Sequence, residues 1–485
     1  MKKILKYSIV LILFSLLQPV FGQPDTLPNY KIEERKALKE LPEEVKYVLT
    51  FEEYLGYVKQ HHPLLKQANL KLSVGEANLL RARGGFDPKI EVDYNRKKFK
   101  NTEYYDELNT TFKIPTWYGI ELKANFEENT GQFLNPSVTV PEGGLYSAGV
   151  SFSLAQGFFI NKRMATLKKA KFFLDQTAAE RDLLVNNLIF EASKAYFEWV
   201  KAYNEQTIYE NFLSNAVMRF KGVKRGVDVG DKAAIDSIEA KIVVQNRRLN
   251  LEAVRLKTRK IALEASNYLW LNSVPLQIRE KIVPELPNKA ILSNLLYLEG
   301  ITSISQTNHP KIRSLNAKIT GLEIDRAYKR NKLLPKLDLQ YNFITADMGN
   351  FDNFNTSNYK AGVNFSFPLF LRKERGEVRL ANLKLQDVNY ERIAASLNIQ
   401  NKIDAVYASI DSLEEQQELI SDIVVNYETL LIAEERKFQL GESSLFLINS
   451  REQKLIQANL KANELQIKFL NANASLYNAL GISEQ

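Results

Sequence analysis

The sequence contains no cysteine and only three histidines. Without cysteine the chain can form no disulfide bond and offers no thiolate to zinc, so packing or assembly must stabilise it. Two of the histidines, His62 and His309, stand directly before a proline, which favours a structural role. No spacing of Ser, Asp or His indicates a nucleophile or an acid pair, and no glycine-rich loop could bind a phosphate. The sequence therefore predicts a protein that is not an enzyme, with no catalytic residues, no metal site and no cofactor.

Long apolar runs and blocks of one charge are also missing. The formal net charge of +8 is spread along the chain, and without a basic block we expect no nucleic-acid binding. No window has the ~20 apolar residues that a membrane-spanning helix needs. The first residues combine Lys2, Lys3 and Lys6 with an apolar run at 9–17 and the small residue Gly22, which is the order of a secretory signal. We expect cleavage after Gly22 and an exported protein.

Glycine and proline are absent from four long stretches, at about 161–221, 231–274, 377–440 and 442–480. Because these two residues interrupt helices, we expect long helices there, paired antiparallel through turns at Gly230 and Gly441. In the third stretch apolar residues recur every three or four positions, from Ile403 through Leu413 to Leu431, in a heptad pattern. The long helices should therefore pack along their length as coiled coils do.

The chain also repeats itself. His62-Pro63 recurs as His309-Pro310 and Pro88 recurs as Pro335, at one offset of 247 residues (310 − 63 = 335 − 88). The repeated unit is about half the chain, far longer than the ~20–50 residues of solenoid repeats. We therefore expect a duplicated domain.

Alternating apolar and polar residues predict two strands in each half, at about 90–98 and 145–154, and at about 336–345 and 358–367. Ala148-Gly149-Val150 matches Ala361-Gly362-Val363 at an offset of 213 (361 − 148), so the first half carries 34 more residues between its strands (247 − 213). This insert, at about 101–136, holds two further alternating runs around Pro115-Thr116-Trp117. We favour an external hairpin for it, and additional barrel strands are the alternative.

Four strands cannot close a barrel, and each unpaired backbone group at an open sheet edge in lipid costs several kcal/mol. Strands in a membrane therefore require assembly, and three copies would supply twelve strands around a water-filled lumen. Aromatic residues gather in the strand regions and suit a membrane interface, although a soluble sandwich core could also take them. The candidate membrane-interface residues are Trp117, Tyr118, Phe152, Tyr341, Phe365 and Phe367.

The predicted fold class is an α+β membrane protein built from a duplicated helix–strand–strand–long-helix-pair unit. Its trimer would form a 12-stranded outer-membrane β-barrel continuous with a long periplasmic α-helical barrel. Residues 1–22 are expected to be the signal peptide and 23–46 a periplasmic N-terminal segment. Residues 47–274 would form the first repeat, 275–300 an equatorial linker, and 301–485 the second repeat.

In its motifs and their order, the chain resembles the TolC-like outer-membrane efflux protein family of channel-tunnels. The resemblance rests on the repeated His-Pro starts, the proline junctions, the Gly-Val-x-Phe strands at Gly149 and Gly362, both tip turns and the closing 476–481 segment. It implies a homotrimer in the cell outer membrane that extends into the periplasm. Partners would be a periplasmic adaptor (membrane fusion) protein, an inner-membrane pump and outer-membrane lipid. The channel would be a passive exit duct of a tripartite efflux or type I secretion system.

The resemblance also implies a gate at the ends of the long helices. An acid is expected six residues after the first tip glycine, which is Asp236, with Glu239 and the aromatic Phe438 as further gate residues. A solvated carboxylate in a first helical turn is the alternative for Asp236. Adaptor docking would fall on the tips, at Val229, Gly230, Leu440 and Gly441.

One alternative function is a periplasmic coiled-coil adaptor or structural envelope protein whose β segments form a soluble module. An adaptor of that kind would carry one helical hairpin flanked by β domains. The two hairpins of this chain favour the duct.

Overall fold

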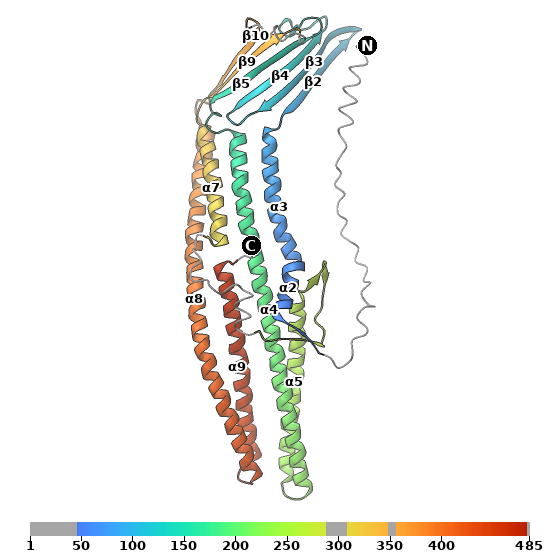
Figure 1. Ribbon diagram of the computed structural model, residues 1–485, viewed down its shortest axis with the longest axis vertical. Coiled ribbons are helices and arrows are strands. Elements are labelled where there is room, and N and C mark those ends of the chain that lie inside the picture. The colour runs from blue at the N-terminus through green and yellow to red at the C-terminus, as the bar shows by residue number, and fades with distance from the viewer. Residues whose placement is uncertain (1–45, 288–307, 348–355, 483–485) are drawn as a thin grey trace. The chain divides into compact units, whose positions relative to one another are not determined.

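The computed structural model describes residues 46–287, 308–347 and 356–482. The predicted signal at 1–22 and nearly all of the 23–46 segment lie outside the described residues, as does part of the 275–300 linker. The unit Val48–Gln485 combines long helices with one large sheet (Figure 1). Within the described ranges, no helix has the length and hydrophobicity to cross a membrane.

The two halves begin in the same way. Strand β1 (Tyr47–Leu49) and helix α2 (Phe51–His61) precede α3 (Pro63–Arg83), and α7 (Pro310–Asn331) opens the second half. Both α3 and α7 start with proline at the first helical position, and the preceding histidine caps the helix. The Nδ1 of His62 accepts from the Leu64 N–H at 3.2 Å, and that of His309 from the Lys311 N–H at 3.1 Å. The structural role predicted for these histidines is confirmed.

A six-stranded antiparallel sheet is the main departure from the sequence prediction. It contains β2 (Lys89–Phe99), β3 (Thr102–Pro115), β4 (Ile120–Thr130), β5 (Leu145–Ala155), β9 (Lys336–Thr345) and β10 (Tyr359–Ser366) in the order β10-β9-β5-β4-β3-β2. The prediction of four strands per chain and an external hairpin is wrong, because the insert forms β3 and β4 inside this sheet. Their alternation matches that of β2 and β5, so apolar side chains meet apolar ones across each pair: Phe112 lies opposite Ile90 and Ala124.

Four long helices follow the strands. They are α4 (Lys162–Asp228), α5 (Ala234–Ser266), α8 (Arg372–Gln439) and α9 (Leu445–Leu480). Helix α4 runs past the expected end at 221, since Gly222 is accommodated in its interior. Helix α5 ends at Ser266, before the expected 274, and Asn272 and Ser273 then turn the chain at φ values of 48° and 72°. This turn joins β6 (Trp270–Leu271) to β7 (Val274–Pro275), and a left-handed turn without glycine gave no sequence signal.

The helices form a single row with two open flanks. Next to the sheet, α3 packs on α4, α4 on α7, and α7 on α8; farther away, α5 packs on α4, α4 on α9, and α9 on α8 (Figure 1). The predicted heptad positions of α8 face this row: Leu413 and Leu431 are buried, and the Gln417 amide donates to the Leu465 carbonyl at 3.4 Å. Short elements complete the fold: 3-10 turns at Gly84–Phe86 and Pro136–Val138, and β8 (Ile282–Pro284).

Candidate functional site

One face of the sheet is apolar from edge to edge. The register aligns a complete row across all six strands: Ile90, Phe112, Ala124, Ala148, Phe343 and Tyr359. Neighbouring rows on the same face are similar, with Leu122, Val150 and Tyr341 in one of them. Most of the large side chains in these rows are exposed in the single chain, 68% for Ile90 and 55% for Tyr359. Such a surface is far larger than a soluble monomer normally exposes.

The opposite face is polar and more enclosed. Thr111 and Asn342 are only 8% exposed there. Lys113 pairs with Glu91 across β3 and β2. The Lys360 ammonium lies 3.5 Å from a Glu127 carboxylate oxygen, although β9 and β5 separate their strands. Neighbouring strands lie ~4.8 Å apart, so these two side chains can meet only across a face that curves inward. An apolar convex face and a polar concave face are the arrangement of a membrane barrel wall.

The aromatic residues predicted for the membrane interface take three positions. Phe152, Tyr341 and Phe365 lie on the apolar face. Trp117, at the turn between β3 and β4, stacks on Phe86 with ring centroids 5.5 Å apart, and the neighbouring Tyr118 is 59% exposed. Phe367 follows directly after β10 and is 39% exposed.

The two helical tips are built alike. Val229 is the C-cap of α4 and Leu440 is the C-cap of α8, and they are 67% and 70% exposed. Gly230 and Gly441 follow with φ values of 84° and 78°, in the left-handed region where a Cβ is unfavourable. The tip residues named from the sequence therefore form two matching exposed turns.

The predicted gate residues lie on different helices close to these turns. Asp236 is in the first turn of α5, where the helix dipole favours an acid. The Asn449 amide of α9 donates to Glu239 at 3.1 Å. The Lys232 ammonium lies 3.7 Å from the Phe438 ring centroid and so links the two tips within one chain. Phe438 also packs against a small core cluster formed by Val223, Ala240 and Leu445.

A buried ionic cluster behind the tips was not identified from the sequence. Glu452 is fully buried and accepts from Arg219 at 3.0 Å and from Arg247 at 3.4 Å. Arg219 also reaches Glu435 at 3.0 Å, and Arg247 reaches the Gln453 amide oxygen at 2.9 Å. The cluster joins all four long helices. The sequence signal for this cluster was Glu452, a charged residue among the buried apolar positions between Ile448 and Leu455 of α9.

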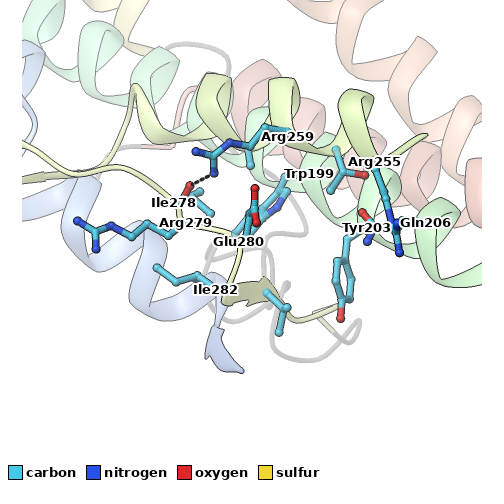
Figure 2. A pocket seen from close by; sticks show the side chains of 12 residues that line it. Trp199, Tyr203, Gln206, Arg255, Arg259, Ile278, Arg279, Glu280 and Ile282 are labelled. Carbon is cyan, nitrogen blue, oxygen red and sulfur yellow. Dashed lines mark hydrogen bonds between the residues drawn. The ribbon is translucent and has the colours of Figure 1, made fainter. Parts of the chain in front are cut away.

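A pocket of about 330 Å³ lies between α4, α5 and the 278–283 segment (Figure 2). Several of its polar side chains are engaged in the structure. Arg259 donates to the Ile278 carbonyl at 3.1 Å, Arg255 pairs with Glu252, and the Thr258 hydroxyl donates to backbone carbonyls. This lining contains no nucleophile beside a base. Among the described residues, no cluster of His, Cys, Asp and Glu could hold a metal ion.

A sheet with its apolar face outward and its polar face inward, followed by an open row of long helices, is the fold of channels that continue from a membrane barrel into a helical tunnel. Comparisons with solved structures agree with this class. The outer membrane channel CmeC of Campylobacter jejuni matches with a TM-score of 0.61 at 14% identity, covering 89% of this chain and 85% of that one. VceC of Vibrio cholerae matches with a TM-score of 0.62 at 14% identity, over 89% and 95%.

Sequence comparisons name the family. Residues 302–482 match the model described as "Outer membrane efflux protein". The pyoverdine export outer membrane protein OpmQ of Pseudomonas aeruginosa is 22% identical over 343 residues, 69% of this chain and 70% of that protein. Residues 302–482 are thus similar to the outer membrane efflux proteins, and the chain has the TolC-like fold of such channels. It is an outer-membrane efflux channel that extends into the periplasm, and not an enzyme.

Proposed function

We propose that three copies of this chain close into a ring and form a passive exit duct. An inner-membrane pump would deliver substrates to it through a periplasmic adaptor. The observation that carries the proposal is an open row of four helices with apolar residues exposed on both of its flanks. The row continues from a sheet whose apolar face is convex and whose polar face is concave.

One flank of the row is formed by α5. Its exposed apolar residues are Ile235, Ile238, Ile242, Leu249, Leu256 and Leu263. The last four recur every seven residues, which places them in one stripe of the helix. Leu249 is 70% exposed, and nothing in the described part of the chain covers it. Nearer the sheet, α3 continues this flank with exposed Leu64, Leu70, Val74 and Leu80.

The opposite flank is formed by α8. Exposed Leu383, Tyr390 and Leu397 recur every seven residues, and exposed Val425 and Ile432 continue the same register. The two flanks lie on opposite sides of the row, so they are different surfaces. Pairing the α8 flank of one copy with the α3 and α5 flank of the next gives a head-to-tail interface, which closes into a ring. Three copies, each with a row of four helices at any level, supply a tunnel of twelve helices.

A charge placed on the α5 stripe tests the ring. We expect Leu249→Glu to reduce the yield of heat-resistant trimer at least tenfold, because a carboxylate would be buried without a partner. Asn250→Glu is the matched control, since Asn250 is exposed on the same helix but points away from the stripe. A normal trimer yield from Leu249→Glu would rule out this interface.

The exposed tips are the proposed docking surface for the adaptor. Val229 and Leu440 present exposed apolar side chains at the helix ends, directly before the turns at Gly230 and Gly441. Val229→Asp together with Leu440→Asp should abolish co-purification of adaptor and pump after chemical crosslinking, while trimer yield stays normal. Undiminished co-purification would place the docking surface elsewhere. The partner recovered with the unmodified protein identifies the pump and therefore the class of cargo.

Asp236, Glu239 and Phe438 are proposed to line the constriction at these tips. Asp236 lies in the first turn of α5, at an exposed helical tip close to the turn at Gly230. Asp236→Ala should lower the cation preference of single channels in planar bilayers. Asp231→Ala is the control, because Asp231 is an exposed acid just outside α5. Equal selectivity of both variants would exclude Asp236 from the constriction.

The remaining assignments rest on the sequence pattern. We propose that 47–274 and 301–485 are the two repeats and that 275–300 is the linker at the equator. Residues 1–22 and 23–46 keep their proposed roles as signal peptide and periplasmic segment. Exposed Tyr118 and Phe367, Trp117 at its turn, and Phe152, Tyr341 and Phe365 on the apolar face are the proposed contacts with membrane lipid.

A further inference from the structure

The hairpin of β3 and β4 is a full part of the sheet wall. Every residue of β3 from Asp106 to Pro115 has a partner on β4, and β4 pairs with β5 from Ile120 to Glu127. On the other side, β3 pairs with β2 over the whole length of β2. The hairpin therefore lies between the first and last strands of the first repeat, and it keeps β2 away from β5.

Both faces of the wall continue through this hairpin. On the apolar face, Phe112, Ile114, Leu122 and Phe126 extend the surface that β5 and β9 begin. Asn109 and Asn125 lie on the polar face, and their buried amide oxygens have no hydrogen-bond partner among the residues that the structure describes. An external hairpin outside the barrel would not need an apolar face toward lipid and a polar face toward the lumen. The hairpin has the two-faced composition of barrel strands.

The edges of the sheet are β2 and β10, and every residue of both strands is exposed. Strand β2 leaves α3 and runs away from the helices, whereas β10 runs back toward α8. The two edges are therefore antiparallel to each other. Strand β2 lies on the same flank as α3 and α5, and β10 lies on the flank of α8 (Figure 1). A neighbouring copy that covers one helical flank would therefore place its own edge strand beside the edge strand on that flank.

We propose that β10 of one copy pairs with β2 of the next, so that three copies close an eighteen-stranded barrel rather than a twelve-stranded one. The proposal rests on the trimer put forward under the proposed function. Each edge strand is paired with the edge strand of a neighbouring copy of this chain. An unpaired edge would be unfavourable, because each unsatisfied backbone group in lipid costs several kcal/mol.

The dimensions of the two parts support this strand number. At a strand spacing of ~4.8 Å and a tilt of ~40°, eighteen strands form a barrel ~36 Å across, and twelve strands form one ~24 Å across. Twelve helices spaced ~8–10 Å apart form a ring ~31–39 Å across. The eighteen-stranded barrel thus continues the helical tunnel at nearly constant width. Its cross-section is roughly twice that of a twelve-stranded barrel, since diameter grows with strand number.

Paired cysteines test the position of the hairpin, and the natural chain has no cysteine to interfere. Asp93→Cys with Asn109→Cys joins β2 to β3, and Asn125→Cys with Ser147→Cys joins β4 to β5, since each pair is directly opposite. A short bifunctional thiol reagent should link both pairs within one chain of the outer-membrane trimer. The control, Asn125→Cys with Ser151→Cys, is offset by four residues and should not link. Absence of both links in an intact trimer would overturn the proposal.

Electron cryomicroscopy of the purified trimer counts the strands directly. Eighteen strands in a closed wall are expected. A trimer with twelve strands and a hairpin outside the wall would refute this inference and leave the trimeric duct standing. A lone chain without a closed barrel would refute the proposed function itself, so the two failures are distinguishable.

Discussion

Replacing Glu452 with glutamine should loosen the helices behind the tips. The carboxylate is fully buried, and the side chains of Arg247 and Arg219 beside it are only 7% and 13% exposed. Removing one member of a buried ion pair costs ~3–5 kcal/mol, because the remaining charge loses its partner. Arg219 keeps Glu435 at 3.0 Å, so we expect the lower end, about 3 kcal/mol. Arg247 would keep only the Gln453 amide oxygen.

Hydrogen–deuterium exchange of the assembled protein, read by mass spectrometry, measures this change locally. A loss of about 3 kcal/mol should speed amide exchange around 445–456 and 240–250 on the order of 100-fold. Glu464→Gln is the matched control on α9, since Glu464 forms only partly exposed pairs with Lys461 and Lys468. Such pairs contribute ~0–1 kcal/mol, and exchange should barely change. If Glu452→Gln exchanged like Glu464→Gln, the cluster would not stabilise the tips.

Two further predictions concern the sheet and the helix caps. A Cβ at Gly149 would collide with the Tyr341 carbonyl oxygen, whereas a Cβ at Gly362 would meet no atom within 4 Å. Gly149→Ala should therefore reduce trimer yield in the outer membrane severalfold, and the control Gly362→Ala should not. Equal yields would refute the close approach of β5 and β9. Burial lowers the pKa of His309 to about 4 from its ordinary ~6.5, so the native state favours the neutral ring, and stability present above pH 6.5 is lost as the pH falls toward 4. For a pKa shift of this size the loss of stability is roughly 3 kcal/mol. His309→Asn can still cap the helix, so its thermal stability should fall less between pH 7 and 4 than that of the unmodified protein. An equal fall would contradict a buried, neutral histidine cap.

The sequence predicted the parts of the fold that depend on local signals. The absence of glycine and proline indicated α4 and α8, and the heptad pattern predicted which side of α8 packs. The His-Pro repeats predicted matching helix starts. The Asn272-Ser273 turn was missed because left-handed backbone is usually marked by glycine, and here it is not.

The insert shows where sequence reasoning stops. Alternation identified two strands in it, but alternation reports only that each strand has two faces. Whether β3 and β4 join the main sheet depends on register with β2 and β5, a tertiary property. The ionic cluster was missed for a related reason, since Glu452 and Arg247 are 205 residues apart and become neighbours only through packing of α5 and α9.

The central claim is that one chain supplies an open segment of wall that only its own copies can complete. The mass of the protein extracted from purified outer membranes tests this most directly, by native mass spectrometry in detergent. The account predicts a complex of three mature chains, each slightly lighter than the 55.6 kDa precursor. A stable single chain recovered without detergent from the periplasm would contradict it.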